Sequence, residues 1–374
     1  HRDLHSFPTR RSSDLFIVIT PSVILIAIFV YFFIGSTFYT SLTNATQVSL
    51  MTDTTEFVGA KNYTDLFYSL LNKRFRLDMV NTVFFTAMFI VSCLGLGLGM
   101  AILLDQKVRG EAVFRTIFLY PMALSFVVTG VIWKWLFNPN SGLNVLPTLA
   151  GLPPLPFRWF LSEQRLLTFN WQDVPNIIVV LAAAVVLLLG LRAWAKSHSQ
   201  TGALLAAAAI LLVALVTFNV PNSTLNFISE TQGFNVALIA VTVAATWQMA
   251  GYTMAMYLAG LRGVSEELRE AARVDGASEF GVYRHIVLPM LTPITLSAII
   301  ILGHISLKIF DLVFTMGGET NLWIDMPSIN MYLTAFRASK IGLGAAIAVV
   351  MLIMVAIVII PYLARNLRES RAEN

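Results

Sequence analysis

The stretch EELREAARVDGASEFGVYRHIVLPML (Glu266–Leu291) is a polar segment in a chain where 57% of the residues are hydrophobic and only 12% are charged. It holds five acidic residues, three arginines and a histidine. Long apolar runs flank it, LIAVTVAATWQMAGYTMAMYLAG before and TPITLSAIIILGHISL after. Soluble domains carry about twice this share of charged residues. The contrast predicts a polar loop between two membrane-spanning helices.

The apolar runs extend over the rest of the chain. Several exceed the ~18 residues that mark a transmembrane helix, and they are continuous rather than alternating, which favours helices over strands. We therefore expect an all-α polytopic membrane protein. About eight transmembrane helices are expected, near Phe16–Tyr39, Val80–Leu104, Val113–Phe137, Asn176–Trp194, Gly202–Val220, Phe234–Leu261, Pro289–Met316 and Ile341–Ala364.

Lysine and arginine set the expected orientation. They are denser in the loops after the second, fourth and sixth spans and in the C-terminal tail, which places these loops and both termini in the cytoplasm. The bias is moderate, because the first external loop is itself basic, with Lys61, Lys73, Arg74 and Arg76. Lysine and arginine in cytoplasmic loops explain the net charge of +4 better than binding of nucleic acid does, and the expected location is the plasma (inner) membrane.

The first fifteen residues, HRDLHSFPTRRSSDL (His1–Leu15), change abruptly into an apolar run. This segment is either a native basic flank of the first span or the translation of one reading frame of a sequencing adapter. We favour the adapter and set the segment aside as non-native.

Catalytic, redox and metal chemistry have little support in the sequence. The single cysteine, Cys93, excludes a disulfide or cysteine-metal framework. The phosphate-binding pattern G-x-x-x-x-G-K-[ST] is absent, so the chain is not expected to be an ATPase by that motif, and H-E-x-x-H and G-x-S-x-G are absent too. We expect neither a bound cofactor nor a metal. The run GLGLGM (Gly95–Met100) predicts close helix packing rather than a phosphate loop.

The opening stretch has the local pattern of helix, turn and helix. Ser265 is suited to cap a first helix, and Glu266 and Glu267 favour its N-terminal end. Gly276 is suited to a left-handed stop. Helical spacing predicts a small apolar face at Leu268, Ala271 and Ala272 and a second helical segment with Phe280, Tyr283 and Val287 before Pro289.

The spacing Glu270-Ala271-Ala272, three residues, Gly276, nine residues, Ile286, one residue, Leu288-Pro289 resembles the EAA loop of binding-protein-dependent ABC transporter permeases. The resemblance covers most of the chain and is strongest to the sugar-permease branch that includes the maltose-transporter membrane subunit. An amphipathic loop without a docking role is the alternative. Other similar segments are EFVGAKNYTDLF (Glu56–Phe67), FRTIFLYPMALSFVVTGVIWKWLFNPNSGLN (Phe114–Asn144), KIFDLVFTMGG (Lys308–Gly318) and YLTAFRASKIGLGAAIAVVMLIM (Tyr332–Met354).

The resemblance implies a permease domain over residues 16–374, with a six-helix type I importer core at 80–137 and 234–364 and a cytoplasmic coupling loop at 262–288. Two features depart from the family: TMGGETN lacks the usual Gly-Gly-Gly-Pro run, and residues 176–220 form an extra apolar hairpin. We expect this hairpin to lie at the periphery, in contact with membrane lipid.

The resemblance also implies partners. A separate ABC ATPase pair, which uses ATP and Mg²⁺, would dock on the coupling loop. A second, different permease subunit would complete the path, and an extracytoplasmic sugar-binding protein would deliver the sugar. The implied coupling residues are Glu270, Ala271, Ala272, Asp275, Gly276, Ile286, Leu288 and Pro289.

A substrate path is expected among polar and aromatic residues within the spans. Trp247 and Tyr252 keep the spacing to Glu270 that a tryptophan and a sugar-contacting tyrosine have in the maltose-type subunit. The other expected path residues are Gln248, Ser306 and Lys308. The alternatives are an aromatic packing stripe for the rings and mutual neutralisation of Lys308 and Asp311.

Two other functional classes remain open on sequence alone. A secondary transporter driven by an ion gradient would place ionisable residues at mid-membrane and often show repeated halves, and few such residues and no clear repeat are found. A membrane enzyme would need a catalytic constellation.

Overall fold

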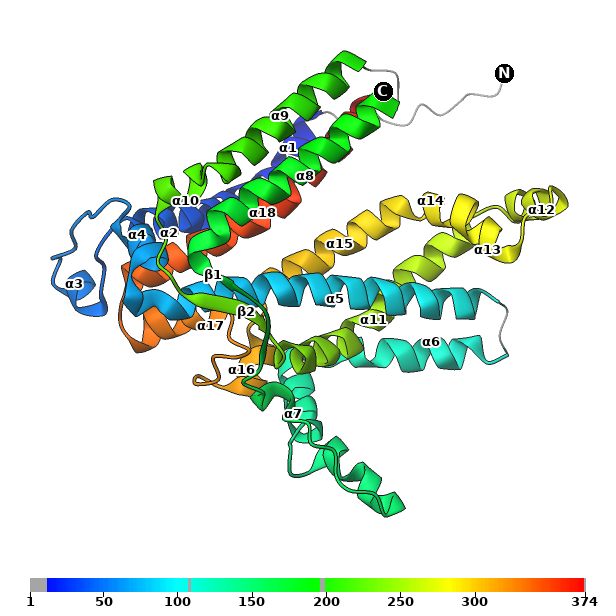
Figure 1. Cartoon of the computed structure of the whole chain (residues 1–374), viewed down its shortest axis with the longest axis horizontal. Coiled ribbons are helices and arrows are strands. Elements are labelled where there is room, and N and C mark those ends of the chain that lie inside the picture. The colour runs from blue at the N-terminus through cyan, green and yellow to red at the C-terminus, as the bar shows by residue number, and fades with distance from the viewer. Residues whose placement is uncertain (1–11, 107–108, 196–198, 373–374) are drawn as a thin grey trace. The chain divides into compact units, whose positions relative to one another are not determined.

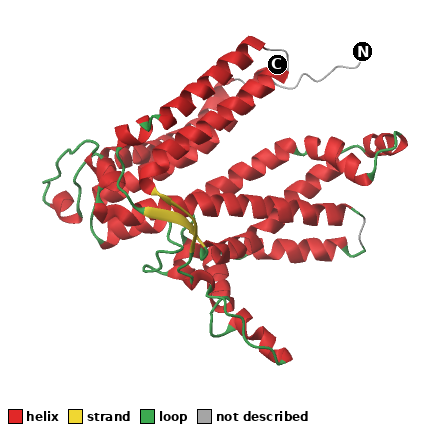
Figure 2. Ribbon diagram, viewed as in Figure 1, coloured by secondary structure: helices red, strands yellow, loops and turns green. Residues whose placement is uncertain are grey.

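The computed structural model describes residues 12–106, 109–195 and 199–372, and this part of the chain is mostly helical (Figure 2). The segment set aside as non-native lies outside the described residues up to residue 11, and α1 begins at Ser12. Contacts divide the chain into two units, His1–Tyr63 with Met331–Leu352, and Thr64–Asn330 with Ile353–Asn374.

The first unit is built around the first predicted span. A π-helical turn, Ala27–Phe32, connects two helices of this unit into one continuous helix. After it, the Asn62 amide donates to the backbone oxygens of Ser41 and Thr43, both at 2.8 Å. The helices that lie wholly or partly in this unit are α1 (Ser12–Ile26), α2 (Phe33–Ser41), α3 (Gln47–Met51), α4 (Lys61–Tyr68), α17 (Pro327–Tyr332) and α18 (Ile341–Ala372).

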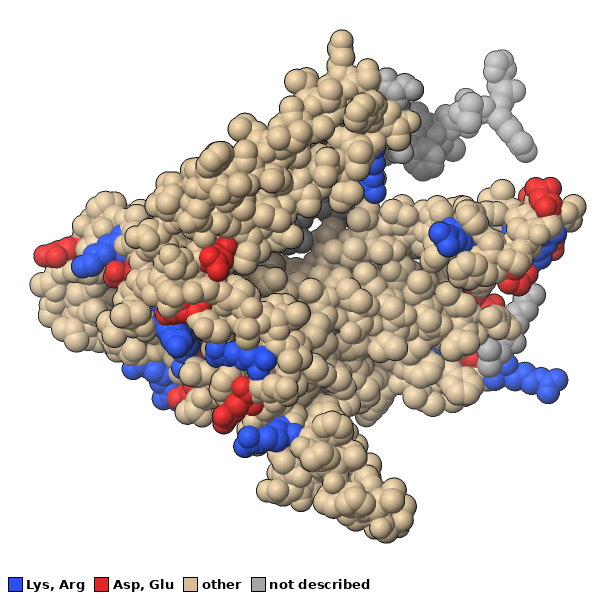
Figure 3. Space-filling model, viewed as in Figure 1, with Lys and Arg blue, Asp and Glu red and all other residues tan. Residues whose placement is uncertain are grey.

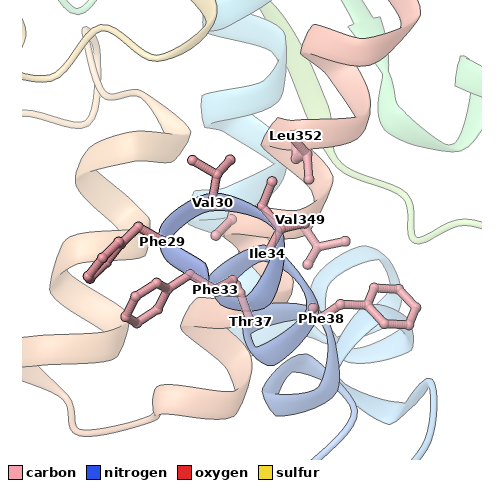
Figure 4. Close-up of a pocket in the computed structure, with 10 residues that line it drawn as sticks. Phe29, Val30, Phe33, Ile34, Thr37, Phe38, Val349 and Leu352 are labelled. Carbon is pink, nitrogen blue, oxygen red and sulfur yellow. Dashed lines mark hydrogen bonds between the residues drawn. The ribbon is translucent and has the colours of Figure 1, made fainter. Parts of the chain in front are cut away.

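This unit also holds an apolar cavity of about 580 Å³ (Figure 4). Phe29 and Phe33 line it from the first helix, and Val349 and Leu352 line it from α18. Phe29 is 63% exposed and Phe33 is 56% exposed. A cavity with this lining offers a polar solute almost no hydrogen bonds, so we do not place the transport path in it.

The second unit has a core of long helices packed side by side. In it α5 (Lys73–Asp105) runs along α11 (Leu238–Gly263), and α15 (Thr292–Leu307) packs on α5 (Figure 1). At Gly97 a Cβ atom would lie 2.2 Å from the Thr253 hydroxyl oxygen, so glycine is needed for the two helices to approach. Gly95 and Gly99 have open space there instead, so close packing concerns one glycine of the run.

The all-α expectation needs one correction, because two short strands pair in this unit. β1 (Arg165–Asn170) lies antiparallel to β2 (Thr231–Asn235), with Arg165 opposite Asn235 and an irregularity between Leu166 and Phe169. The strands come from polar segments on either side of the extra hairpin. They were missed because each is short and its partner is far away in the sequence.

The expectation of eight spans is also corrected. Four described helices are long and apolar enough to cross a membrane, or up to six if each of two bent pairs counts as one span. The four are Ile19–Ser41, Leu70–Asp105, Trp171–Ala195 and Ser199–Thr217. Among the remaining predicted spans, α11 is long but carries more polar residues, and α18 is apolar over Ile341–Ile357.

The predicted span Val113–Phe137 is broken. α6 (Glu111–Leu119) and the turn Tyr120–Ala123 make an angle of 99° with α7 (Phe126–Leu136). Pro121 lies in this turn, and the Ser125 hydroxyl caps α7 by accepting a hydrogen bond from the Val128 amide at 3.3 Å. The second bent pair is Glu279–Met290 and Thr292–Leu307, with a bend of 62° at the start of the predicted span Pro289–Met316. This predicted span is also interrupted at its other end, because α15 ends at Leu307 and α16 (Asp311–Gly317) follows as a separate helix.

The extra hairpin consists of α8 (Val174–Ala195) and α9 (Ser199–Thr217), followed by α10 (Val220–Leu225). Gly190 and Gly202 allow the close approach, since a Cβ at Gly202 would lie 3.1 Å from the Gly190 carbonyl oxygen. At its base the side-chain oxygen Oδ1 of Asn222 accepts from the Asn176 backbone amide at 3.1 Å. Most of the surface of the hairpin is exposed and uncharged (Figure 3), and its contact with lipid stays a prediction.

The segment between α7 and β1 is held by its own hydrogen bonds. The Asn144 amide donates to the carbonyl oxygens of Pro139 and Phe157, and its oxygen accepts from the Trp159 indole N–H at 2.7 Å. Short 3₁₀ helices at Gly142–Ala150 and Trp159–Leu161 complete this folded loop.

Candidate functional site

The opening stretch folds as two short helices joined at a glycine. α12 (Glu266–Val274) is followed by α13 (Glu279–Val282), a π-helical turn at Tyr283–Val287, and α14 (Leu288–Met290) (Figure 1). The predicted left-handed residue is present, because Gly276 has φ +86°. The Ala277 amide donates to the Ala272 oxygen at 2.9 Å and the Gly276 amide to the Arg273 oxygen at 3.0 Å, which is the Schellman ending of a helix.

The helix starts differ from the prediction. Ser265 occupies the N-cap position of α12, but its side chain makes no capping hydrogen bond. Glu266 and Glu267 lie in the first turn, where the helix dipole favours them. The Ser278 hydroxyl is the one that caps, by accepting from the Gly281 amide at 3.2 Å at the start of α13.

The predicted apolar face of α12 is largely free. Leu268 is 47% exposed, Ala271 is exposed, and Ala272 is half-buried. Just after this face, Val274 is 87% exposed and Phe280 is 73% exposed. Apolar side chains left uncovered beside charged ones are what a protein-docking surface presents.

The loop is nevertheless anchored to the long helices. Val282, Val287 and Leu291 are buried in one cluster with the ends of α5 and α11, including Leu104 and Leu261. The motif positions are less buried than their neighbours, since Ile286 is half-buried and Leu288 and Pro289 are exposed. The residues that anchor the loop in the buried cluster are therefore not the residues of the sequence motif.

Charged side chains line a groove of about 740 Å³ beside α12. Arg273 donates to Glu279 at 2.7 Å and to Glu266 at 3.2 Å, and the Arg273 guanidinium lowers the pKa of the Glu279 carboxyl. These pairs are exposed and contribute little to stability. Glu270 and Asp275 are exposed. The groove is lined by Asp105, Gln106, Glu266, Arg269, Glu270, Arg273, Glu279 and Tyr283.

Three of the expected path residues lie on α11, and two of them, Trp247 and Gln248, contact the broken span. The Trp247 ring packs edge-on against Trp133 of α7, with centroids 5.8 Å apart. Gln248 is buried, and its amide donates to the Leu124 carbonyl oxygen at 2.7 Å, at the turn before α7. Tyr252 is half-buried. This contact with the break could not be predicted, because Trp133 and Leu124 are more than a hundred positions from Trp247 and Gln248 in the sequence.

The other two expected path residues lie elsewhere. The buried Ser306 hydroxyl accepts from Thr86 of α5 at 2.9 Å and donates to the Gly303 oxygen at 2.9 Å. Lys308 and Asp311 are both exposed, and within the described residues no ion pair joins them. Mutual neutralisation of these two residues is therefore not supported.

Sequence reasoning missed the strongest polar contacts at both ends of α5. At its start Arg76 is fully buried and pairs with Glu230, and the neighbouring Arg74 pairs with Asp325. At its end Asp105 pairs with Arg269 at 2.8 Å. The available signal was a set of charged residues at the edges of an apolar run, but nothing in the sequence indicated their partners.

Comparison with known proteins identifies the class. Residues 93–369 match the family of the binding-protein-dependent transport system inner membrane component. Over 361 residues the chain is 33% identical to a probable ABC transporter permease protein of Pyrococcus horikoshii, covering 95% of this chain and 97% of that protein. It is 31% identical over 285 residues to a xylose/arabinose import permease protein of Haloferax volcanii, covering 75% of this chain and 67% of that protein.

A more distant relative is a trehalose/maltose transport system permease protein of Thermococcus litoralis, 24% identical over 353 residues, which cover 93% of this chain and 92% of that protein. The fold is similar to that of a chain in the crystal structure of a bacterial ABC transporter involved in import of the acidic polysaccharide alginate. The TM-score is 0.61, at 16% identity, covering 95% of this chain and 96% of that chain.

These matches exclude the two alternative functional classes, an ion-driven secondary transporter and a membrane enzyme. The protein is a multi-pass membrane permease subunit and not the ATPase of its transporter. The chain belongs to the family of binding-protein-dependent ABC transporter inner membrane permeases.

Proposed function

We propose that this chain is a permease subunit of an ATP-driven importer for a sugar, and that it forms half of the translocation path beside a different permease subunit. The relatives named for xylose/arabinose and trehalose/maltose import support the sugar as cargo. The observation that carries the proposal is the structure of α12 and its glycine turn. The loop that contains them is anchored to α5 and α11 by a buried apolar cluster, while apolar side chains of α12 stay exposed.

In this proposal the ATPase pair docks on α12 and the turn at Gly276. ATP and Mg²⁺ are used by that partner, and this chain performs no covalent chemistry. Closure of the ATPase pair moves α12, and the packed ends of α5 and α11 follow it, which gives alternating access. A sugar-binding protein delivers the cargo at the opposite end.

We propose that the α12 end and both termini face the cytoplasm. The density of lysine and arginine in the loops supports this orientation.

We place sugar contacts at Trp247, Gln248 and Tyr252, with Ser306 and Lys308 further along the path. A ring face stacks on the C–H face of a sugar, and amide and hydroxyl groups bind its hydroxyls. The contacts of Trp247 and Gln248 at the break between α6 and α7 support this placement, since irregular backbone at membrane depth occurs where it is buried or lines a cavity.

The decisive experiment is purification of the whole transporter with its ATPase and partner permease, followed by ATP hydrolysis across a panel of sugars with their binding proteins. We expect one sugar class to stimulate hydrolysis. Glu270→Lys is expected to weaken ATPase recovery, with normal insertion in the membrane. Normal recovery and normal stimulation in both Glu270→Lys and Gly276→Val would show that this loop is not the docking element.

A further inference from the structure

Arg269 is the one residue of α12 whose side chain is fully packed into the protein. The residue is 8% exposed, whereas the other residues of α12 are exposed or half-buried. A long charged side chain is seldom buried unless it is paired. Its partners therefore indicate what holds α12 to the rest of the chain.

The guanidinium of Arg269 binds two different helices. Nη1 donates to Asp105 Oδ2 at 2.8 Å, at the last residue of α5, and the Asp105 side chain is 11% exposed. Nη2 donates to the Leu261 carbonyl oxygen at 2.7 Å, in the last turn of α11. The Leu261 carbonyl also accepts from the Val264 amide at 3.3 Å, and the arginine adds a second, charged donor at the end of α11 where the helix dipole favours a cation.

The remaining guanidinium nitrogen of Arg269, Nε, makes no hydrogen bond, so the contacts with Asp105 and Leu261 fix the position of the side chain. Nε of Arg269 lies 4.0 Å from Glu266, too far for a hydrogen bond, and it is buried without a hydrogen-bond partner. The side chain is therefore set by Asp105 and Leu261 and not by its neighbours on α12.

The remaining polar contacts of α12 are of a different kind. The pairs of Arg273 with Glu266 and Glu279 stay within the loop segment and are exposed, and their side chains are 39–64% exposed. Such pairs contribute little and connect α12 to no long helix. Among the described residues, Arg269 is therefore the charged residue of α12 that connects this helix to both α5 and α11.

We propose that Arg269, held by Asp105 and the Leu261 carbonyl, is the positioning residue that makes α5 and α11 move together with α12. The proposal rests on the proposed docking of the ATPase on α12. The planar guanidinium has donors for two acceptors in fixed directions, whereas a lysine ammonium on a flexible stem holds such a geometry poorly.

The test uses the assembled transporter in proteoliposomes, with sugar transported per ATP hydrolysed as the readout. Arg269→Gln is expected to keep normal ATPase recovery and to lower transport per ATP about tenfold, within the ~5–150-fold range typical of coupling between sites. Asp105→Asn is expected to act in the same direction. The double variant is expected to be no worse than Arg269→Gln, because Arg269→Gln already removes the contact that Asp105→Asn breaks.

The matched control is Glu111→Gln. It breaks another arginine–carboxylate pair at the same end of the molecule, since Arg262 of α11 donates to Glu111 of α6 at 2.5 Å, but this pair is more exposed. We expect its transport per ATP to stay close to normal. A loss as large as that of Arg269→Gln would mean that any ion pair at this end matters, and would overturn the special role of Arg269.

A second construction covers the case in which Arg269→Gln does not assemble. In a Cys93→Ser background the paired changes Asp105→Cys and Arg269→Cys allow a short bismaleimide to join α5 and α12 covalently, because Cys93 is the single native cysteine. Transport per ATP is expected to be low before linking and to recover in part after it, because the link restores the connection to α5 but not the contact with the Leu261 carbonyl. A formed link without recovery would overturn the proposal.

The two hypotheses fail differently. If Arg269→Gln retains normal transport per ATP while Glu270→Lys loses the ATPase, docking on α12 stands and the Arg269 link is wrong. If Glu270→Lys and Gly276→Val both retain the ATPase and its stimulation, the docking proposal itself is wrong.

Discussion

Gly276 ends α12 in a left-handed conformation with φ +86°, and a Cβ atom placed there would meet nothing within 4 Å. In the isolated chain, glycine is therefore favoured at this position by the left-handed backbone conformation, and not by a lack of room for a side chain. This separates two reasons for a small residue that the sequence pattern alone leaves together, namely strain in the turn and close approach of a partner protein.

A pair of substitutions at Gly276 distinguishes these reasons. Gly276→Val is expected to strain the turn by ~1–3 kcal/mol and to weaken recovery of the ATPase on purification. Gly276→Asn is expected to be close to normal, because asparagine tolerates the left-handed region. If Asn is as harmful as Val, the partner must approach the side-chain position closely, and backbone strain is not the cause.

Tyr252 offers a second test at the scale of one residue. If it contacts the sugar, Tyr252→Ala should raise the half-saturating sugar concentration, with ring stacking and a hydroxyl hydrogen bond together worth ~1–3 kcal/mol. Tyr252→Phe should lose the smaller, hydroxyl part. The measurement is the concentration dependence of uptake in vesicles, with assembly checked by purification. An unchanged concentration dependence would move the site elsewhere, such as the partner subunit.

Among the elements, those with local causes were predictable. The first span, α5 and the hairpin α8–α9 follow from long apolar runs, and the turn at Gly276 follows from its residue type. The break between α6 and α7 was not predicted, although Pro121 and Ser125 lie at it, because the apolar composition continues across the bend. Hydropathy reports which residues avoid water and not whether their helix axis is straight.

The hairpin α8–α9 is the element that the protein should tolerate losing. Its helices pack on each other through Gly190 and Gly202 and are otherwise mostly exposed. Its two ends lie close, because Asn222 accepts a hydrogen bond from the amide of Asn176. Replacing residues 176–220 with a short Gly-Ser link is expected to retain transport in reconstituted vesicles. A complex that assembles but transports nothing would place this hairpin on the path.

Over the whole of the second unit, α5 is fixed at both ends by charged contacts. At 33 residues it is about 50 Å long, with Arg74 and Arg76 paired at one end and Asp105 at the other. The sequence showed these residues as loop charges, and Arg74 and Arg76 even weakened the predicted orientation. Their partners are more than 150 positions away, and pairings at such distances cannot be inferred from local composition.

The pairing of Arg74 with Asp325 predicts a stability effect that depends on pH. The Asp325 side chain is 1% exposed, and burial raises the pKa of its carboxyl, while Arg74 lowers it. Arg74→Gln should therefore raise that pKa further. A carboxyl with a higher pKa in the folded state binds its proton more tightly there, so stability falls as pH rises above the unfolded value of about 3.9.

The thermal unfolding temperature of the purified protein in detergent tests this between pH 5 and pH 8. Arg74→Gln should be less stable than the parent by ~1–3 kcal/mol at pH 8, a loss discounted because the Arg74 side chain is 28% exposed, and the difference should shrink toward pH 5. Lys73→Gln removes the neighbouring, exposed charge and should change little at either pH. A difference that is constant or that grows as pH falls would mean that the loss in Arg74→Gln does not come from an unpaired, ionised Asp325.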